Sequence, residues 1–172
     1  MFLSVRELEL HKVRFDVAFA QGQFDFLDKW IRQAEPLEVS GEAELLASIQ
    51  EIRVRGHVRG RIECDCDRCL ENAAFPIDRG FDLLYRPDEV PAACQEVRIS
   101  KGESEIGFYE GGGLELADIV REQILLWLPM QRLCTPECKG ICPSCGANRN
   151  MDICGCEPRE SDSRWAALRQ MI

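Results

Sequence analysis

Histidine, positive charge and long apolar runs are all scarce in this sequence. Its 172 residues contain two histidines, His11 and His57, which excludes a histidine-rich catalytic metal centre. Lysine and arginine number 21 against 30 aspartates and glutamates. The resulting net charge of −9 gives no overall electrostatic attraction to nucleic acid. Any RNA contact would therefore need a local basic patch or a protein partner.

The sequence lacks several motifs that other classes of protein require. No stretch is long and apolar enough to span a bilayer, and the first ten residues carry charges in place of a signal-peptide core. Gly111-Gly112-Gly113 is not followed by Lys and Ser or Thr, so it is not a phosphate-binding P-loop. No paired carboxylates or Cys–His pair indicate an enzyme. The sequence therefore predicts a cytoplasmic, non-enzymatic protein.

Cysteine, in contrast, is abundant, and most of it is clustered. Two cysteines that flank a two-residue turn can direct both sulfurs to one point, and a tetrahedral zinc needs four sulfurs at about 2.3 Å. In the cytosol, clustered cysteines bind metal more often than they form disulfides. An iron–sulfur cluster is the alternative, but nothing else suggests electron transfer. We interpret eight of the ten cysteines as zinc ligands: Cys66, Cys69, Cys134, Cys138, Cys142, Cys145, Cys154 and Cys156.

The spacing also favours one way of dividing these ligands. We expect the last four to hold one zinc, with the turn after Cys145 allowed by a positive φ at Gly146. The first four would hold a second zinc and join the upstream pair to the C-terminal segment. A single zinc drawn from the C-terminal six is the alternative. Either site would be structural, because four thiolates leave no open position for water. Cys64 and Cys94 are interpreted as non-ligands.

A basic row occupies one face of the clearest strand. Apolar residues at 52, 54, 58 and 62 alternate with Arg53, Arg55, His57, Arg59 and Arg61. Arginine forks match phosphate oxygens, so this row is a candidate RNA contact, together with Lys139 and Arg149 near the metal loop. The alternative is an ordinary sheet face on which Glu42 and Glu44 of the preceding strand neutralise the arginines.

The remaining patterns complete an α+β prediction. Alternation predicts strands at residues 1–20, 37–49, 52–62, 75–85 and 106–109, while helical spacing predicts helices at 25–34, 115–128 and 161–172. Within the helix at 25–34, Asp25 would be the N-cap and Trp30 a core anchor. We expect a mainly antiparallel β-sheet with a few helices and a C-terminal cysteine-rich zinc-binding segment. One domain would cover 1–172, with the zinc-binding segment at 134–156 and a mobile loop at 87–104.

The ordered set of motifs resembles the YceD family, named for large ribosomal RNA subunit accumulation. The matching stretches are Cys66-Asp-Arg-Cys69-Leu-Glu71, Asp118 to Pro129, Leu133 to Asn150, Cys154-Gly-Cys156 and Arg164 to Leu168. The resemblance spans the chain from about Glu35 to the C-terminus. Cys64, Cys94 and a compact hairpin turn near Ser48 depart from the family pattern without undermining it.

The resemblance implies a non-enzymatic role in the accumulation or processing of 23S ribosomal RNA, and so in assembly of the large ribosomal subunit. The implied partners are 23S ribosomal RNA or its precursor, or a large-subunit ribosomal protein, with no membrane and no small-molecule substrate. The implied cofactor is structural zinc, as one or two ions. A second hypothesis of another class is an acidic interaction module that chaperones a basic ribosomal protein, which the net charge favours.

Overall fold

The computed structural model describes residues 1–46, 50–88 and 106–156, which form two compact units. The first unit contains Met1–Cys64 and Ala74–Met130, and the second contains Asp65–Ala73 and the residues from Gln131 onward. The elements in chain order are β1 (Phe2–Ser4), α1 (Val5–Leu8), β2 (Val13–Phe19), β3 (Ile31–Gln33), β4 (Leu37–Leu46), β5 (Glu51–Asp65), β6 (Asn72–Pro87), β7 (Ile106–Tyr109), β8 (Gly113–Glu115) and α2 (Leu116–Trp127).

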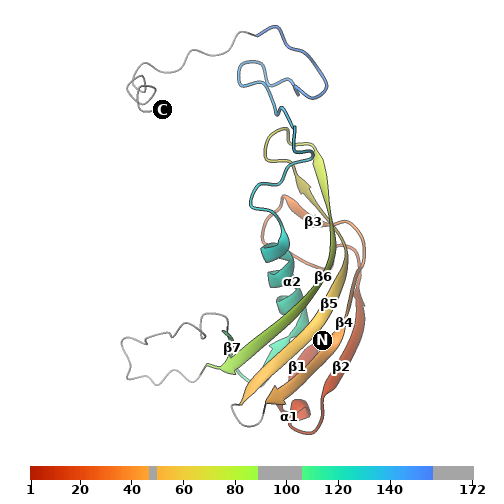
Figure 1. Ribbon diagram of the computed structural model, residues 1–172, viewed down its shortest axis with the longest axis vertical. Helices are drawn as coiled ribbons and strands as arrows, with labels where there is room; N and C mark the ends of the chain where they lie inside the picture. The colour runs from red at the N-terminus through yellow and green to blue at the C-terminus, as the bar shows by residue number, and fades with distance from the viewer. Residues whose placement is uncertain (47–49, 89–105, 157–172) are drawn as a thin grey trace, which may run out of the picture. The chain divides into compact units, whose positions relative to one another are not determined.

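A six-stranded sheet forms the frame of the first unit. Its strand order is β2-β4-β5-β6-β7, and β3 pairs with β5 off this path. The β2–β4, β3–β5 and β4–β5 pairs are antiparallel, whereas β7 runs parallel to β6. β1 and β8 form a separate two-stranded antiparallel sheet. The predicted α+β class with a mainly antiparallel sheet is confirmed (Figure 1).

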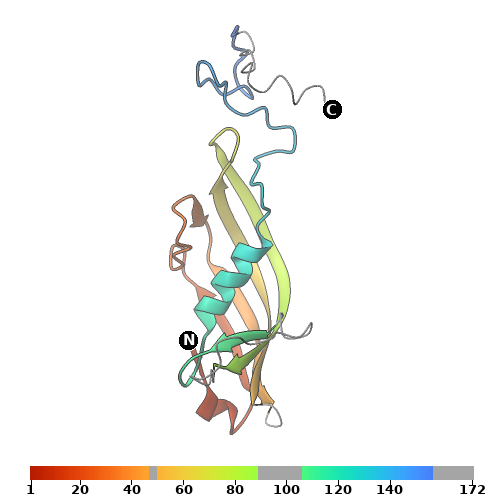
Figure 2. The same ribbon diagram turned by 90° about the vertical axis from the view of Figure 1, so that its left-hand side faces the viewer.

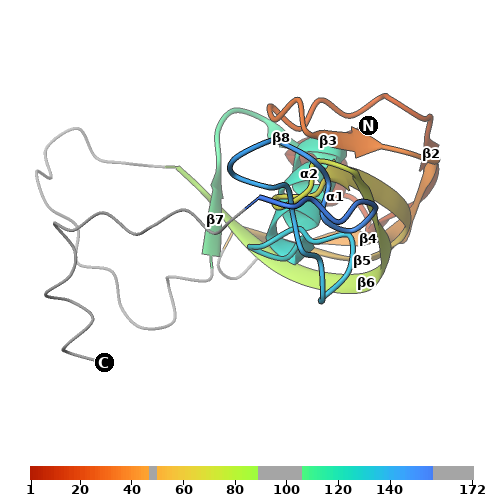
Figure 3. The ribbon, with the colours of Figure 1, turned by 90° about the horizontal axis from the view of Figure 1, so that it is seen from above.

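The core lies between α2 and one face of the curved sheet. Figures 2 and 3 show α2 lying across this face, with the strands curving around it. Val120 and Ile124 of α2 are fully buried, and so are Val39, Val54 and Val58 of the central strands. Burial of each such side chain contributes roughly 1.5–3 kcal/mol. The predicted alternation on residues 37–46 and 52–62 and the predicted helix at 115–128 are therefore confirmed.

The strand register also confirms the predicted pairing of charges. Glu42 lies opposite Arg55, and Glu44 lies opposite Arg53. This register follows from the pleat, because a shift by one residue would turn the apolar side chains of β5 away from the core.

Two predictions near the N-terminus are wrong. Residues 25–34 form no helix: turns lead into β3, and Leu27 has a φ of 58°. The carboxylates of Asp25 and Asp28 each accept a hydrogen bond from the backbone N–H two residues further on, which competes with helical bonding. Trp30 is not a core anchor, since 46% of its surface is exposed. Phe24 and Phe26 are buried there instead.

The other departures concern the ends of elements. Residues 1–20 contain α1 between β1 and β2, so the predicted continuous strand is interrupted. Several predictions lie outside the described residues. They are the loop at 87–104 apart from its first two residues, the end of the strand at 37–49, the turn near Ser48, Cys94 and the helix at 161–172. The single domain expected over 1–172 stays a prediction.

Candidate metal centres

Two separate stretches of chain build the second unit. Residues 66–71 form a tight turn between β5 and β6, in which the Leu70 N–H donates to the Cys66 carbonyl at 2.9 Å. Asp67 joins this turn to the C-terminal stretch: its N–H donates to the Arg132 carbonyl at 2.8 Å, and its carboxylate accepts the Arg132 N–H at 2.6 Å. The Arg68 guanidinium donates to the Cys138 carbonyl at 3.0 Å. These bonds hold the two cysteine pairs together.

The first group of thiols has the geometry of a four-sulfur site. The sulfurs of Cys66, Cys69, Cys134 and Cys138 lie within 4.8 Å of one another. The Cys66–Cys138 sulfur distance is 3.8 Å, and the Cys69–Cys134 distance is 3.5 Å. A tetrahedron with metal–sulfur bonds of about 2.3 Å has sulfur–sulfur edges of about 3.8 Å. A disulfide needs about 2.05 Å, so these distances fit metal ligands and not cross-links.

The second group of thiols comes from the C-terminal stretch alone. The sulfurs of Cys142, Cys145, Cys154 and Cys156 also lie within 4.8 Å of one another. The Gly146 N–H donates to the Cys142 carbonyl at 2.8 Å, which closes the predicted turn, and Gly146 has a φ of 76°. Cys142 is buried, whereas Cys145 and Cys156 are exposed. The two groups are those that the sequence favoured.

The surroundings of several thiols shift their pKa values in opposite directions. Burial acts to raise the pKa of Cys66, but backbone N–H groups, including that of Arg68, outweigh it and lower this pKa to about 6. In the second group, backbone N–H groups lower the pKa of Cys142 to about 6. Burial raises the pKa of Cys69 to about 12, and the neighbouring Cys145 thiol raises that of Cys156 to about 12.

These opposite pKa shifts indicate why each group of thiols would bind a cation. In the first group Cys66 and Cys138 lose their protons more readily than a free thiol and Cys69 less readily, and in the second group Cys142 does so more readily and Cys156 less readily. Burial and repulsion between negative sulfurs therefore oppose full deprotonation of either group. A divalent cation between the sulfurs would remove that repulsion and deprotonate the remaining thiols. Both donor sets therefore fit a soft, tetrahedral ion such as zinc.

Residues between the cysteines support the sulfurs, and the sequence analysis missed them. The Asn150 side chain donates to the Cys138 sulfur at 3.3 Å and accepts the Lys139 N–H at 2.8 Å. Gly140 has a φ of 71°, and a Cβ there would lie 2.9 Å from the Arg68 carbonyl oxygen. An asparagine and a glycine between paired cysteines were a visible signal, but their contacts depend on how the two stretches meet.

The basic row on β5 forms ion pairs with carboxylates from three other parts of the chain. The pairs are Arg53–Asp82 at 2.6 Å, Arg55–Glu42 at 2.5 Å, His57–Asp78 at 2.9 Å, Arg59–Asp78 at 3.7 Å and Arg61–Glu35 at 3.4 Å. The Arg53 guanidinium hydrogen-bonds Asp82 and lowers the pKa of that carboxyl. A phosphate would have to displace these partners. RNA contact by this row stays a prediction.

Lys139 and Arg149, the other two candidate RNA contacts, are not part of the basic row. Both are exposed, and within the described part of the chain neither side chain has an ion-pair partner. Their backbones are fixed, since the Arg149 N–H donates to the Gly140 carbonyl at 2.9 Å. Both cations are therefore available to an anionic partner.

A curved sheet combined with two four-thiol groups defines a small α+β protein with a cysteine-rich unit that could hold metal ions. The family model for the large ribosomal RNA subunit accumulation protein YceD matches residues 54–171, so this chain belongs to the YceD family. The resemblance given by the motifs is confirmed.

Relatives with similar sequences include plant and bacterial proteins. A chloroplastic maize protein named large ribosomal RNA subunit accumulation protein YCED homolog 1 is 29% identical over 63% of this chain and 45% of its own length. Its Arabidopsis thaliana namesake is 26% identical over 77% of this chain and 47% of its own length. An uncharacterized Bacillus subtilis protein, YlbN, is 21% identical over 98% of this chain and 93% of its own length.

The chain thus spans about half the length of the plant relatives that it matches. No solved structure matches this chain. Among the described residues, no helix has the length and apolar character needed to cross a membrane.

Proposed function

We propose that this chain is a cytoplasmic, non-enzymatic factor for accumulation of large-subunit ribosomal RNA, with a C-terminal unit held by two structural zinc ions. The family supplies the process, since its description names large ribosomal RNA subunit accumulation. The observation that carries the non-enzymatic part is the arrangement of eight thiols in two groups of four. Four thiolates would complete the coordination of each ion and leave no position for a reacting water.

The proposal predicts the outcome of a complementation experiment. In a strain whose chromosomal copy is deleted, we expect the wild-type gene to restore the ratio of 23S to 16S ribosomal RNA. The Cys66→Ser/Cys142→Ser variant should fail to restore this ratio, whereas Cys64→Ser should succeed because Cys64 belongs to neither thiol group. The ratio is measured by electrophoresis of total RNA. A deletion strain with a normal ratio would contradict the proposed function.

Direct RNA contact is the first form that this function could take. Lys139 and Arg149 supply unpaired cations within the described residues, whereas Arg55 and Arg59 already face carboxylates. The zinc-bound loop would fix the first two cations, and arginine would add bidentate contact to phosphate. The proposed contact is therefore centred on the metal loop, with the β5 row contributing less.

Ultraviolet cross-linking in cells, followed by sequencing of the attached RNA, tests this contact. We expect cross-links at defined positions of 23S ribosomal RNA. The Lys139→Ala/Arg149→Ala variant should lower them and reduce the salt dependence of binding in vitro by a slope of about two. Arg55→Ala/Arg59→Ala should have a smaller effect, because those guanidiniums already have partners. Equal cross-linking by both variants and the wild type would contradict the assignment.

An acidic module for a basic ribosomal protein is the second candidate. The net charge of −9 and the neutralised β5 row favour it, since opposite potentials steer association. Co-purification of basic ribosomal proteins without any RNA cross-link would favour this candidate over the first.

A further inference from the structure

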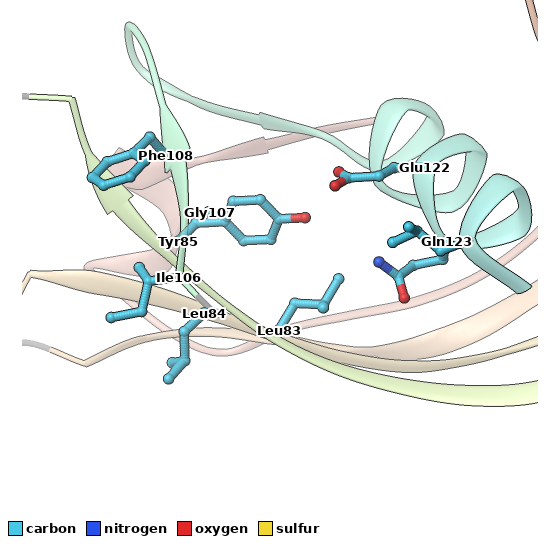
Figure 4. Close-up of a pocket in the computed structure, with 9 residues that line it drawn as sticks. Leu83, Leu84, Tyr85, Ile106, Gly107, Phe108, Glu122 and Gln123 are labelled. Atoms are coloured by element: carbon cyan, nitrogen blue, oxygen red, sulfur yellow. The ribbon is translucent and has the colours of Figure 1, made fainter. Parts of the chain in front are cut away.

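A pocket of about 450 Å³ opens between α2 and the strands β6 and β7, within the first unit. Its volume lies in the range of sites that bind ligands. Its walls combine apolar side chains, such as Leu83, Phe108 and Leu126, with a comparable share of polar surface. Figure 4 shows the Tyr85 hydroxyl pointing toward α2, where Glu122 and Gln123 lie. The proposed RNA function makes no use of this pocket.

Two buried polar side chains in the pocket lack partners. Tyr85 and Gln123 are each only 8% exposed. Among the described residues, neither side chain forms a hydrogen bond. Within the described part of the chain, no fully enclosed side-chain nitrogen or oxygen is unsatisfied, so the polar atoms of Tyr85 and Gln123 still reach solvent, which the pocket provides. Because no protein group occupies their hydrogen-bonding positions, these two side chains can bond to an occupant of the pocket.

The charge of the side chains that line the pocket indicates which kind of ligand it would bind. Of the described residues that line it, Glu122 is the one with a charged side chain, and none is a lysine or arginine. A phosphate group would therefore meet a carboxylate and no cation, whereas a basic group would gain an ion pair. Burial, and then the Glu122 carboxylate, raises the pKa of Tyr85 to about 12, so the phenol stays protonated and can donate a hydrogen bond.

The strand beside the pocket favours an extended peptide. β7 is the last strand of the six-stranded sheet, so one of its edges has no partner strand within the described residues. A peptide can pair with such an edge while its side chains enter a neighbouring pocket. The primary amide of Gln123 can donate to a peptide carbonyl and accept from a peptide N–H at the same time. Phe108 and Leu126, which are 59% and 68% exposed, offer apolar contact.

Gly107 leaves room for the Tyr85 ring beside the pocket. A Cβ at Gly107 would lie 2.6 Å from the Tyr85 ring, so any larger residue would displace the ring from its place in the pocket. The glycine lets the Tyr85 ring lie close to β7.

We propose that this pocket binds an extended, basic peptide segment of a partner protein, with an apolar side chain between the walls and a lysine or arginine paired with Glu122. The Gln123 amide and the Tyr85 hydroxyl would bond to the peptide backbone. This inference rests on the second proposed function, an interaction with a basic ribosomal protein, and assigns it a site.

Binding of short overlapping peptides that cover the large-subunit ribosomal proteins tests the inference. Fluorescence polarisation with the full chain should identify basic peptides that contain an apolar residue. Gln123→Leu and Glu122→Gln should each weaken the strongest binder by roughly ten- to hundredfold. Glu9→Gln is the matched control, because Glu9 is exposed and does not line the pocket. Gln123→Leu should keep the melting temperature, since it removes a buried amide without a partner.

Three outcomes would overturn the inference: no peptide binds, acidic peptides bind equally well, or the pocket variants bind like the wild type. Loss of binding to a 23S RNA fragment in Gln123→Leu, with peptide binding unchanged, would assign the pocket to RNA and also overturn it. If the wild type restores 23S RNA in the deletion strain while no peptide binds, the inference fails and the proposed function stands. If 23S RNA is normal in the deletion strain, the proposed function fails by itself.

Discussion

Replacing Cys66 or Cys142 with serine should release one equivalent of zinc and unfold the part of the second unit that holds that ion, while the sheet stays folded. The buried side chains in the described part of this unit are four cysteines and Ala73, so no cluster of large apolar residues holds it together. The free energy of metal binding must then supply its stability. For structural zinc in small domains this is about 10–16 kcal/mol at neutral pH.

Metal analysis and amide hydrogen exchange measure this prediction separately. Zinc content should fall from two equivalents to one in each single variant and to none in the double variant. Exchange should become fast around the thiol group that has lost its ion, at residues 66–71 and 131–140 in Cys66→Ser and at residues 141–156 in Cys142→Ser, and should stay slow in β4 and the part of β5 that belongs to the first unit. The control is Cys64→Ala, which should keep both equivalents because Cys64 lies outside both thiol groups. Unchanged zinc content in Cys66→Ser and Cys142→Ser would show that the thiols are not ligands.

Replacing Gly41 with valine should lower the free energy of unfolding of the first unit by about 3 kcal/mol or more. Gly41 of β4 lies opposite Gly56 of β5. A Cβ at Gly41 would lie 2.2 Å from the Arg55 carbonyl oxygen and 2.7 Å from the Phe15 ring. The ring could turn away, but the carbonyl belongs to the central strand pair and could not move without breaking the ladder.

Gly112→Val provides the control, because a Cβ there would have no atom within 4 Å. Its unfolding midpoint in urea should stay close to that of the wild type, whereas that of Gly41→Val should fall with little change in slope. Equal midpoints for Gly41→Val and the wild type would show that β4 and β5 are separated more widely than the structure has them.

The failed helix at 25–34 shows how local spacing can mislead. Phe26, Leu27 and Trp30 have helical spacing, but Leu27 and Trp30 are exposed and the backbone follows aspartate-bonded turns. The alternative pattern, in which Phe24 and Phe26 are both buried, was also present in the sequence. Only the packing of those rings with each other and with Phe19 distinguishes the two patterns.

The basic row illustrates a second limit. Pairing of Glu42 and Glu44 with β5 could be predicted, because a hairpin sets the register of adjacent strands. The partners from β6, Asp78 and Asp82, could not be assigned. Their register with β5 depends on the form of the intervening turn at residues 66–71, which the alternation pattern does not specify.

The amino-acid sequence alone was enough to predict the strands β4 and β5, the helix α2, the candidate ligands and their favoured division. These features depend on alternation, helical spacing and short cysteine spacing, which act over a few residues. Only the tertiary structure decided that β7 runs parallel to β6, that Asn150 supports Cys138, and that Tyr85 and Gln123 meet in one pocket. These contacts join residues distant in the chain, and their energies depend on the burial and shape of the folded protein.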